Sequence, residues 1–431
     1  MHNSIKLNIL IVYADPDYPL KSTIRDLLYC FRNESNHNVF YFDAVNTVFN
    51  PNHFEQIKFD LVIFHKLFIH GRFKGFKNEQ FKQKHLINTA WLKGFDTVKI
   101  VMTQDEWYGS DFICKFIDDY NISKVFTVAP QSEWNKIFGK VKNKSVEYIE
   151  VLTGYFDQTI INMVEEKKKL QRKRRTDVGY RAFKNPPMLG RFGFLKTQIA
   201  DTFNEFLKNK NLIIDISTQS KDIIYGDKWY DFLLDCRFQL GVEGGATVQD
   251  NDGAIWFKGN DYIAKHPDAS FEQIEEACFK GKDGKFDLKA LSPRHLEACL
   301  TETCQVLIEG HYNGILKPDV HYIPVKPDFS NLEEVFSKMQ NTELTKYLVG
   351  NAYKDIVSSN KFTYKAMVQQ VIEKSLTFNV NGISILSFRS KFLLQLNDFL
   401  SQKWWNYRNS GNHSIFSMMI LSLQKIKVIN K

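Results

Sequence analysis

Three residues with complementary chemistry lie together in the stretch LSPRHLEACL (291–300), namely Ser292, Arg294 and Glu297. Ser292 has the position of an N-cap and a proline follows it, which predicts a helix beginning at residue 293. Backbone amides at a helix start attract an anion such as a pyrophosphate, Arg294 could bind it in a bidentate manner, and Glu297 could accept both hydroxyls of a ribose. The stretch therefore predicts part of a nucleotide site. The alternative is an ordinary helix start whose acidic residue complements the helix dipole.

Three more basic residues could neutralise a diphosphate leaving group. Arg181 ends the segment TDVGYR (176–181), which has the pattern of a strand, and Arg191 and Lys196 lie in GRFGFLK (190–196) at the start of a predicted helix. Ligands of open parallel sheets bind beyond the carboxyl ends of the strands, so these positions suit a phosphate site. The alternative for each is a solvated surface charge.

The segment GVEGGATVQDNDG (241–253) carries glycines at the end of a predicted strand. Gly244 and Gly245 would let backbone amides approach an anion without obstruction by a Cβ atom, or they form a plain tight turn. The same segment contains DND (250–252), which superficially matches the DxD signature of metal-dependent sugar transfer. That signature belongs to a single-domain fold, so we expect no metal site here.

A second set of polar residues follows strands in the N-terminal half. Asp105 and Glu106 end the strand-like segment VKIVMTQDE (98–106), and His65 and His70 flank a neighbouring strand. A carboxylate pair at a strand end predicts a general base or a site for a second substrate. Plain polar loop residues are the alternative, above all for the histidines.

Strands and helices alternate along most of the chain. Residues 1–155 contain near-continuous apolar strands such as KLNILIVYAD (6–15), which is typical of parallel strands buried on both faces. A second alternating series follows after residue 175. The pattern predicts two Rossmann-like αβα domains, at 1–175 and 176–345, with a mostly helical segment at 346–431.

Two basic segments have alternative interpretations. The run KKKLQRKRR (167–175) is either a solvated helix end or a patch for anionic lipid or another polyanion. The C-terminal stretch 392–431 is aromatic, apolar and basic, so it could pack across both domains or lie on a membrane.

The composition is that of a globular protein with an anionic partner. The 431 residues carry a formal net charge of +8 and include 36 Phe and six scattered Cys. We expect buried, reduced cysteines, since no CxxC pair is present. The N-terminus does not resemble a signal peptide, and no apolar run reaches the length of a membrane span. We therefore expect a cytoplasmic protein that is soluble or peripheral at the inner face of a membrane.

The segment LGVEGGATVQDNDG, followed by LSPRHLEACLTETCQVLIEGHYNGILKPDVHYIPV, resembles the C-terminal half of bacterial glycosyltransferases with the two-domain GT-B fold. The similarity is to the "glycosyl transferases group 1" type of surface-polysaccharide gene clusters. It covers about residues 176–345. The N-terminal half matches only in its αβ layout and in KIVMTQDEWYGSDF, and the last eighty or so residues match nothing.

The resemblance implies a nucleotide-sugar donor in the C-terminal domain and a glycan or lipid-linked acceptor at the N-terminal domain, without a metal or other cofactor. Glu297 matches the residue that holds the donor ribose, and Arg191 and Lys196 have the spacing of the family's diphosphate clamp. One position departs, because many relatives have a second Glu where this chain has Lys289. Glu243 beside the glycines could supply that sugar contact instead.

Two other functions fit parts of the sequence. A two-domain nucleotide-sugar epimerase would use the same nucleotide site without an acceptor. A nucleic-acid-binding protein would use the basic run 167–175, although the chain has no recognisable nucleic-acid motif. We therefore expect no nucleic-acid partner.

Overall fold

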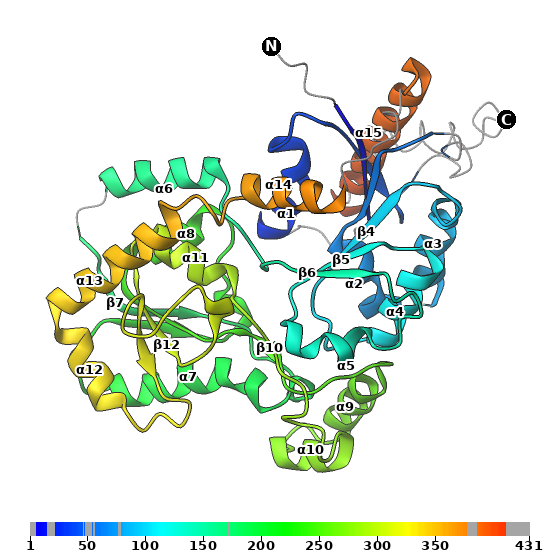
Figure 1. Ribbon diagram of the computed structural model, residues 1–431. Helices are drawn as coiled ribbons and strands as arrows, with labels where there is room; N and C mark the ends of the chain where they lie inside the picture. Colours follow the sequence, from blue (N-terminus) through cyan, green and yellow to red (C-terminus); the bar gives the residue numbers. More distant parts are fainter. Residues whose placement is uncertain are drawn as a thin grey trace.

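The computed structural model describes residues 6–14, 22–45, 47, 54, 57–75, 79–170, 173–376 and 386–410. Within these residues the chain forms two parallel β-sheets, each covered by helices on both faces (Figure 1). The prediction of two Rossmann-like αβα units followed by C-terminal helices is confirmed.

The first sheet has the strand order β2-β1-β3-β4-β5-β6, and every pairing is parallel. Its strands are β1 (Asn8–Tyr13), β2 (Asn38–Asp43), β3 (Leu61–Phe64), β4 (Val98–Thr103), β5 (Lys124–Thr127) and β6 (Glu147–Glu150). Alternate residues of β1 enter two separate cores, with Leu10 and Val12 on one side and Ile9 and Ile11 on the other. This explains why the strand is apolar throughout, because neither face meets water.

The helices that alternate with these strands along the chain cover the sheet. They are α1 (Ser22–Asn33), α2 (Lys66–Gly75), α3 (Glu79–Asn88), α4 (Ser110–Asp119) and α5 (Trp134–Phe138). Side chains of α2, α4 and α5 enter one core, and those of α1, with Leu67 of α2, enter the other. We call this sheet and its helices the first unit.

The second sheet has the order β13-β12-β9-β7-β8 and is also parallel throughout. Its strands are β7 (Thr176–Arg181), β8 (Ile214–Ser217), β9 (Cys236–Gly241), β12 (Cys304–Ile308) and β13 (Tyr322–Val325). The helices of this second unit are α6 (Gln158–Leu170), α7 (Arg191–Leu207), α8 (Asp227–Asp235), α11 (Pro293–Leu300), α12 (Leu332–Gln340) and α13 (Thr342–Ala352). All six cysteines are buried and unpaired, as expected.

An insertion between β9 and α11 joins the two units. It contains the antiparallel pair β10 (Gly244–Ala246) and β11 (Leu288–Ala290) and the helices α9 (Ala254–Lys265) and α10 (Phe271–Cys278). Ala246, Phe286 and Leu288 pack in the same core as Trp107 and Tyr108 of the first unit. The backbone of Asp250 is also hydrogen bonded to Trp107 and Gly109.

The C-terminal helices return to the first unit. After α13, a π-helical turn (Tyr353–Val357) packs on the second unit, and α14 (Tyr364–Ser375) then packs beside α1 (Figure 1). The last helix, α15 (Phe388–Ser410), lies along β2, the edge strand of the first sheet, and contributes Leu394 and Leu400 to the core. None of the helices in the described part of the chain has the length and apolarity that a membrane span requires.

Candidate functional site

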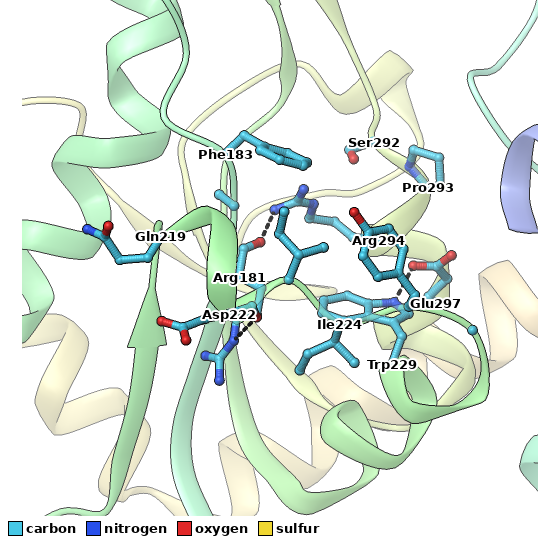
Figure 2. Close-up of a pocket in the computed structure, with 14 residues that line it drawn as sticks. Arg181, Phe183, Gln219, Asp222, Ile224, Trp229, Ser292, Pro293, Arg294 and Glu297 are labelled. Atoms are coloured by element: carbon cyan, nitrogen blue, oxygen red, sulfur yellow. Dashed lines mark hydrogen bonds between the residues drawn. The ribbon is translucent and has the colours of Figure 1, made fainter. Parts of the chain in front are cut away.

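A pocket of about 270 Å³ opens beside the carboxyl ends of β7 and β8 and the start of α11 (Figure 2). We call it the α11 pocket. It is lined by Arg181, Ala182, Phe183, Gln219, Asp222, Ile223, Ile224, Tyr225, Gly226, Trp229, Ser292, Pro293, Arg294 and Glu297. The sequence predicts Ser292, Arg294, Glu297 and Arg181 for a nucleotide site, and the structure brings these four residues together.

Glu297 lies in the wall of the α11 pocket, where the indole Nε1 of Trp229 donates a hydrogen bond of 2.7 Å to its Oε2 atom (Figure 2). Burial raises the pKa of Glu297, and the Trp229 hydrogen bond and the charge of Arg294 partly oppose this effect. A carboxylate accepts several hydrogen bonds, so the contact with Trp229 leaves capacity for the two hydroxyls of a ribose.

The start of α11 has the predicted form. Ser292 precedes the helix in an extended conformation, Pro293 is its first residue, and the Ser292 side chain makes no capping hydrogen bond. Arg294 lines the pocket, and its NH1 group donates to the carbonyl oxygen of Arg181 at 2.8 Å. The guanidinium of Arg294 and a helix start therefore border the cavity next to Glu297, which suits an anionic ligand.

Several pocket residues were not predicted. Trp229 lies on α8, and residues 222–226 belong to the loop between β8 and α8. The exposed rings of Phe183 and Tyr225 lie on the same pocket. No local pattern marks these residues, because only the assembled sheet brings the loop and α8 against α11.

The guanidinium of Arg181 makes hydrogen bonds and an ion pair within the protein. It donates to the backbone oxygens of Tyr180, Asp215 and Asp222 and pairs with the Asp215 carboxylate at 2.7 Å. Although Arg181 lines the α11 pocket, its guanidinium contacts β8 and the loop that follows it. In this structure it therefore positions the pocket wall, and we do not assign it a contact with a ligand.

Arg191 and Lys196 differ in their surroundings on α7. Arg191 is exposed, pairs with Glu272 and Glu275 of α10, and does not line the α11 pocket. Lys196 is half-buried, and its charge contributes, after burial and Arg294, to lowering the pKa of His295 on α11 to about 4. Neither residue lines the α11 pocket, and only Lys196 contributes to the lowered pKa of His295.

Glu243 and the two glycines have structural contacts. The buried carboxylate of Glu243 accepts hydrogen bonds from the backbone amides of His311 and Tyr312, which follow β12. Gly244 and Gly245 form strand β10 and not an open loop. A Cβ atom on Gly245 would lie 1.8 Å from the backbone oxygen of Leu288, so the approach of β11 explains this glycine without an anion.

At the end of β4, Asp105 meets His70, with 3.2 Å between Asp105 Oδ2 and His70 Nε2. The Asp105 side chain is 40% exposed and its φ angle is +58°. Burial raises the pKa of Asp105, but the contact with His70 and the charges of Arg72 and Lys66 outweigh it, so the pKa lies below its ordinary value. Burial lowers the pKa of Lys66 to about 8.

Arg72 fixes the backbone that carries Asp105. Its fully buried guanidinium donates to the backbone oxygens of Ile69, Gln104, Asp105 and Tyr108. These bonds hold the turn after β4 in one conformation. Together, Lys66, His70, Arg72 and Asp105 form a group of titratable side chains at the carboxyl edge of the first sheet, which we call the β4 edge.

Glu106 lies beneath this edge and is fully buried. Its Oε1 atom accepts hydrogen bonds from the hydroxyls of Thr103 and Thr127, and burial raises its pKa. A group without access to solvent cannot reach a substrate hydroxyl in this conformation. Of the predicted carboxylate pair, only Asp105 is therefore placed to contact a substrate. His65 is also fully buried.

The DND segment caps a helix. The buried carboxylate of Asp250 accepts hydrogen bonds from the amides of Gly253, Ile255 and Trp256 at the start of α9. Within the described residues, no group of three or more His, Cys, Asp or Glu side chains is arranged to hold a metal ion.

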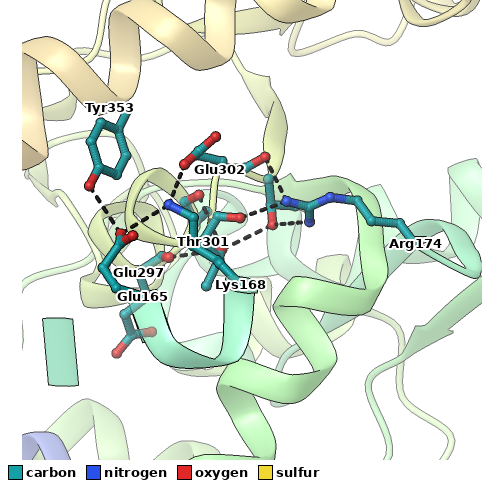
Figure 3. A network of polar contacts seen from close by, with 9 residues as sticks. Glu165, Lys168, Arg174, Glu297, Thr301, Glu302 and Tyr353 are labelled. Carbon is teal, nitrogen blue, oxygen red and sulfur yellow. Dashed lines mark hydrogen bonds and ion pairs between the residues drawn. The ribbon is translucent and has the colours of Figure 1, made fainter. Parts of the chain in front are cut away.

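The charges of the basic run 167–175 are largely paired within the second unit. Lys167 pairs with Asp231, Lys168 with Glu165 and Glu302, Lys169 with Glu166, and Arg175 with Asp235. Arg174 is half-buried and donates to the backbone oxygens of Thr301 and Glu302 after α11 (Figure 3). Arg172 lies outside the described residues. The paired charges favour a structural role at the junction over a patch for a polyanion.

The two units are in contact beside the start of α11. The Thr153 hydroxyl, after β6, donates to the carbonyl oxygen of Leu291, which precedes α11. The Asn313 side chain accepts from the Leu291 amide and donates to Glu150 of β6. The carboxyl edge of the first sheet therefore faces the start of α11.

No protein-family model and no curated protein matches the sequence. Among solved structures, Alr3699/HepE of Anabaena in complex with UDP and glucose is similar over 85% of this chain and 99% of its own, with 10% identity and a TM-score of 0.43. The β-glucosyltransferase of phage T4 is similar over 86% and 100%, with 11% identity and a TM-score of 0.47. TarM is similar over 76% and 57%, with 11% identity and a TM-score of 0.39. At these scores we base no assignment of activity on the similarity.

Proposed function

We propose that the protein is a glycosyltransferase that transfers a sugar from a nucleotide-sugar donor held in the α11 pocket. The observation that carries this proposal is the combination of Glu297, Arg294 and the start of α11 around one cavity at the carboxyl edge of a parallel sheet. A ribose requires a hydroxyl acceptor, and a diphosphate requires positive charge and free amides. Glu297 supplies the hydroxyl acceptor, and Arg294 at the start of α11 supplies positive charge beside it.

In the proposed mechanism, Glu297 binds the ribose, while the start of α11 with Arg294 and Lys196 stabilises the diphosphate as it leaves. The sugar then lies toward the carboxyl edge of the first sheet, which also carries the β4 edge. An acceptor hydroxyl attacks the anomeric carbon through a transition state that resembles an oxocarbenium ion. Asp105 is ionised at neutral pH and partly exposed, so it is our candidate to accept the hydroxyl proton, with His70 orienting its carboxylate.

We further propose that the acceptor is a surface glycan or is lipid-linked, and that the reaction needs no metal. This acceptor class is suggested by the sequence resemblance of residues 176–345. Such an acceptor implies that the protein works at the cytoplasmic face of a membrane. Positive charge from Arg294, Lys196 and the α11 amides could take the part that a metal ion plays for a diphosphate leaving group. We do not assign Glu243 a catalytic part, since its carboxylate is occupied by the loop after β12.

The test is a titration of the purified protein with UDP-, GDP-, CMP- and dTDP-linked sugars, read as the rise in melting temperature, with Glu297→Ala in parallel. Stabilisation depends on ligand concentration relative to Kd, so one series ranks the bases. We expect one nucleotide to stabilise the wild type and to act much more weakly on the variant. If none stabilises the wild type, the proposed function is wrong. Conversion of the bound sugar nucleotide without any acceptor would instead indicate an epimerase.

A further inference from the structure

Helix α15 has apolar side chains on two opposite faces. Leu394 and Leu400 are buried against the first unit. Phe388, Phe392 and Phe399 are 87%, 56% and 51% exposed. Their spacing of four and seven residues places the three rings on one stripe of the helix, away from the buried leucines. The helix lies on the outer side of the first unit, remote from the second sheet (Figure 1).

The charges of α15 are mostly positive. Its sequence has Arg389, Lys391, Lys403 and Arg408 but only one acidic residue, Asp398. Asp398 pairs with Arg32 of α1 at 3.0 Å, so it does not offset the cations of the exposed face. Arg389 and Lys391 are exposed beside Phe388 and Phe392. A stripe of aromatic rings with flanking cations suits the headgroup region of a membrane with anionic lipids.

We propose that the stripe of Phe388, Phe392 and Phe399, with Arg389 and Lys391, docks the protein on an anionic lipid bilayer. The proposal deepens the proposed function, because it rests on an acceptor that is presented at a membrane. The first unit, which carries the β4 edge, would then be the unit held at the lipid surface.

The size of the stripe favours a bilayer over a second copy of the chain. A buried Phe side chain covers roughly 150–250 Å², so the exposed parts of the three rings amount to roughly 400 Å². A stable interface between proteins buries about 800 Å² on each partner. A single row of rings with cations beside it is thus small for a dimer, but it can enter the boundary between headgroups and acyl chains.

The test is sedimentation of the full chain with vesicles of phosphatidylcholine alone and of phosphatidylcholine mixed with phosphatidylglycerol. We expect binding to the mixed vesicles that weakens with salt. The variant Phe388→Ser/Phe392→Ser should bind about tenfold more weakly for each ring removed. Arg389→Gln/Lys391→Gln should lose mainly the salt-dependent part. Leu170→Ser and Ile213→Ser are matched controls, because these side chains are 82% and 63% exposed on the second unit, and their binding should not change.

Equal vesicle binding by the wild type and the double Phe variant would overturn the proposal, as would no binding by the wild type. A variant that changes from dimer to monomer in sedimentation velocity, with unchanged vesicle binding, would identify a second copy as the occupant and also overturn it. The melting-temperature response to sugar nucleotides is measured on the same variants. Since vesicle binding needs no donor, a failure of the donor site and a failure of the docking surface give different results.

Discussion

The Trp229 indole is the direct protein partner of Glu297, and its loss should change the pH dependence of nucleotide binding. The hydrogen bond lowers the pKa of Glu297 and so opposes the effect of burial. In Trp229→Phe the pKa of Glu297 should rise further, because the ionised form loses a donor. The carboxylate is then protonated at a higher pH, and binding should weaken about 3- to 10-fold near neutral pH.

Calorimetric titration of the nucleotide at several pH values measures this shift. Trp134→Phe is the matched control, because the Trp134 indole donates one hydrogen bond to Ala129 in the first unit. An unchanged pH profile in Trp229→Phe would contradict the part we assign to this pair.

The buried carboxylate of Glu106 should make stability depend on pH. Its pKa in the folded protein is raised by burial. A carboxyl whose pKa is raised on folding contributes stability at low pH, and this contribution is lost as the pH rises through the folded-state pKa. Glu106→Gln removes the titration and keeps an oxygen that can accept from Thr103 and Thr127.

Denaturant unfolding at about pH 5 and about pH 7.5 tests this prediction. The free energy of unfolding of Glu106→Gln, relative to that of wild type, should be larger at the higher pH, which means that the variant is relatively more stable there. A relative stability that stays constant, or that favours the variant at the lower pH, would show that Glu106 does not titrate as we infer.

At the scale of elements, the contact between β10 and β11 explains one of the two glycines. A methyl group on Gly245 would collide with the backbone oxygen of Leu288, while the nearest atom to one on Gly244 is 3.7 Å away. Gly245→Ala should therefore lower the free energy of unfolding by about 2–4 kcal/mol, and Gly244→Ala by less than about 1 kcal/mol. Denaturant unfolding of both variants measures the difference. Equal stabilities of the two variants, combined with a loss of nucleotide affinity in Gly245→Ala, would instead indicate that Gly245 contributes to an anion site.

The sequence predicts elements well where the apolar pattern is continuous. The strands of both sheets and the helix that begins at Pro293 follow from local residues, because parallel strands are apolar on both faces and a proline suits a first helical turn. The pattern did not reveal α9 and α10. It also could not separate Asp105 from Glu106, since only the assembled sheet shows that one is partly exposed and the other lies under Thr103 and Thr127.

Partners across the chain are likewise hidden from the sequence. The spacing of Arg191 and Lys196 suggested one clamp, but the acidic side chains that pair with Arg191 belong to α10. The contact of Trp229 with Glu297 joins residues 68 positions apart. Such pairs follow from the topology of the second sheet and have no local signal.

At the scale of the whole molecule, α14 should belong to the folding of the first unit although it follows the second in sequence. Met367 of α14 and Met339 of α12 are each 1% exposed, in the cores of the first and second units respectively. Each Met→Ala change should lower the free energy of unfolding by about 2–5 kcal/mol.

Hydrogen exchange should distinguish the two variants. Met367→Ala should reduce protection mainly at amides of β1–β3, and Met339→Ala mainly at amides of β12 and β13. Loss of protection in the second sheet alone for Met367→Ala would contradict the arrangement in which the C-terminal chain completes the first unit.

The central claim is that Glu297 holds the ribose of a sugar nucleotide in the α11 pocket. The most direct measurement is the Kd of the nucleotide that stabilises the protein best, and of its 2′-deoxy analogue, for wild type and Glu297→Gln. If Glu297 accepts the 2′-hydroxyl, removing either partner should weaken binding about 10-fold or more, and removing both should cost little beyond either single change. Equal losses from the analogue in both proteins would show that Glu297 does not contact this hydroxyl and would contradict the account.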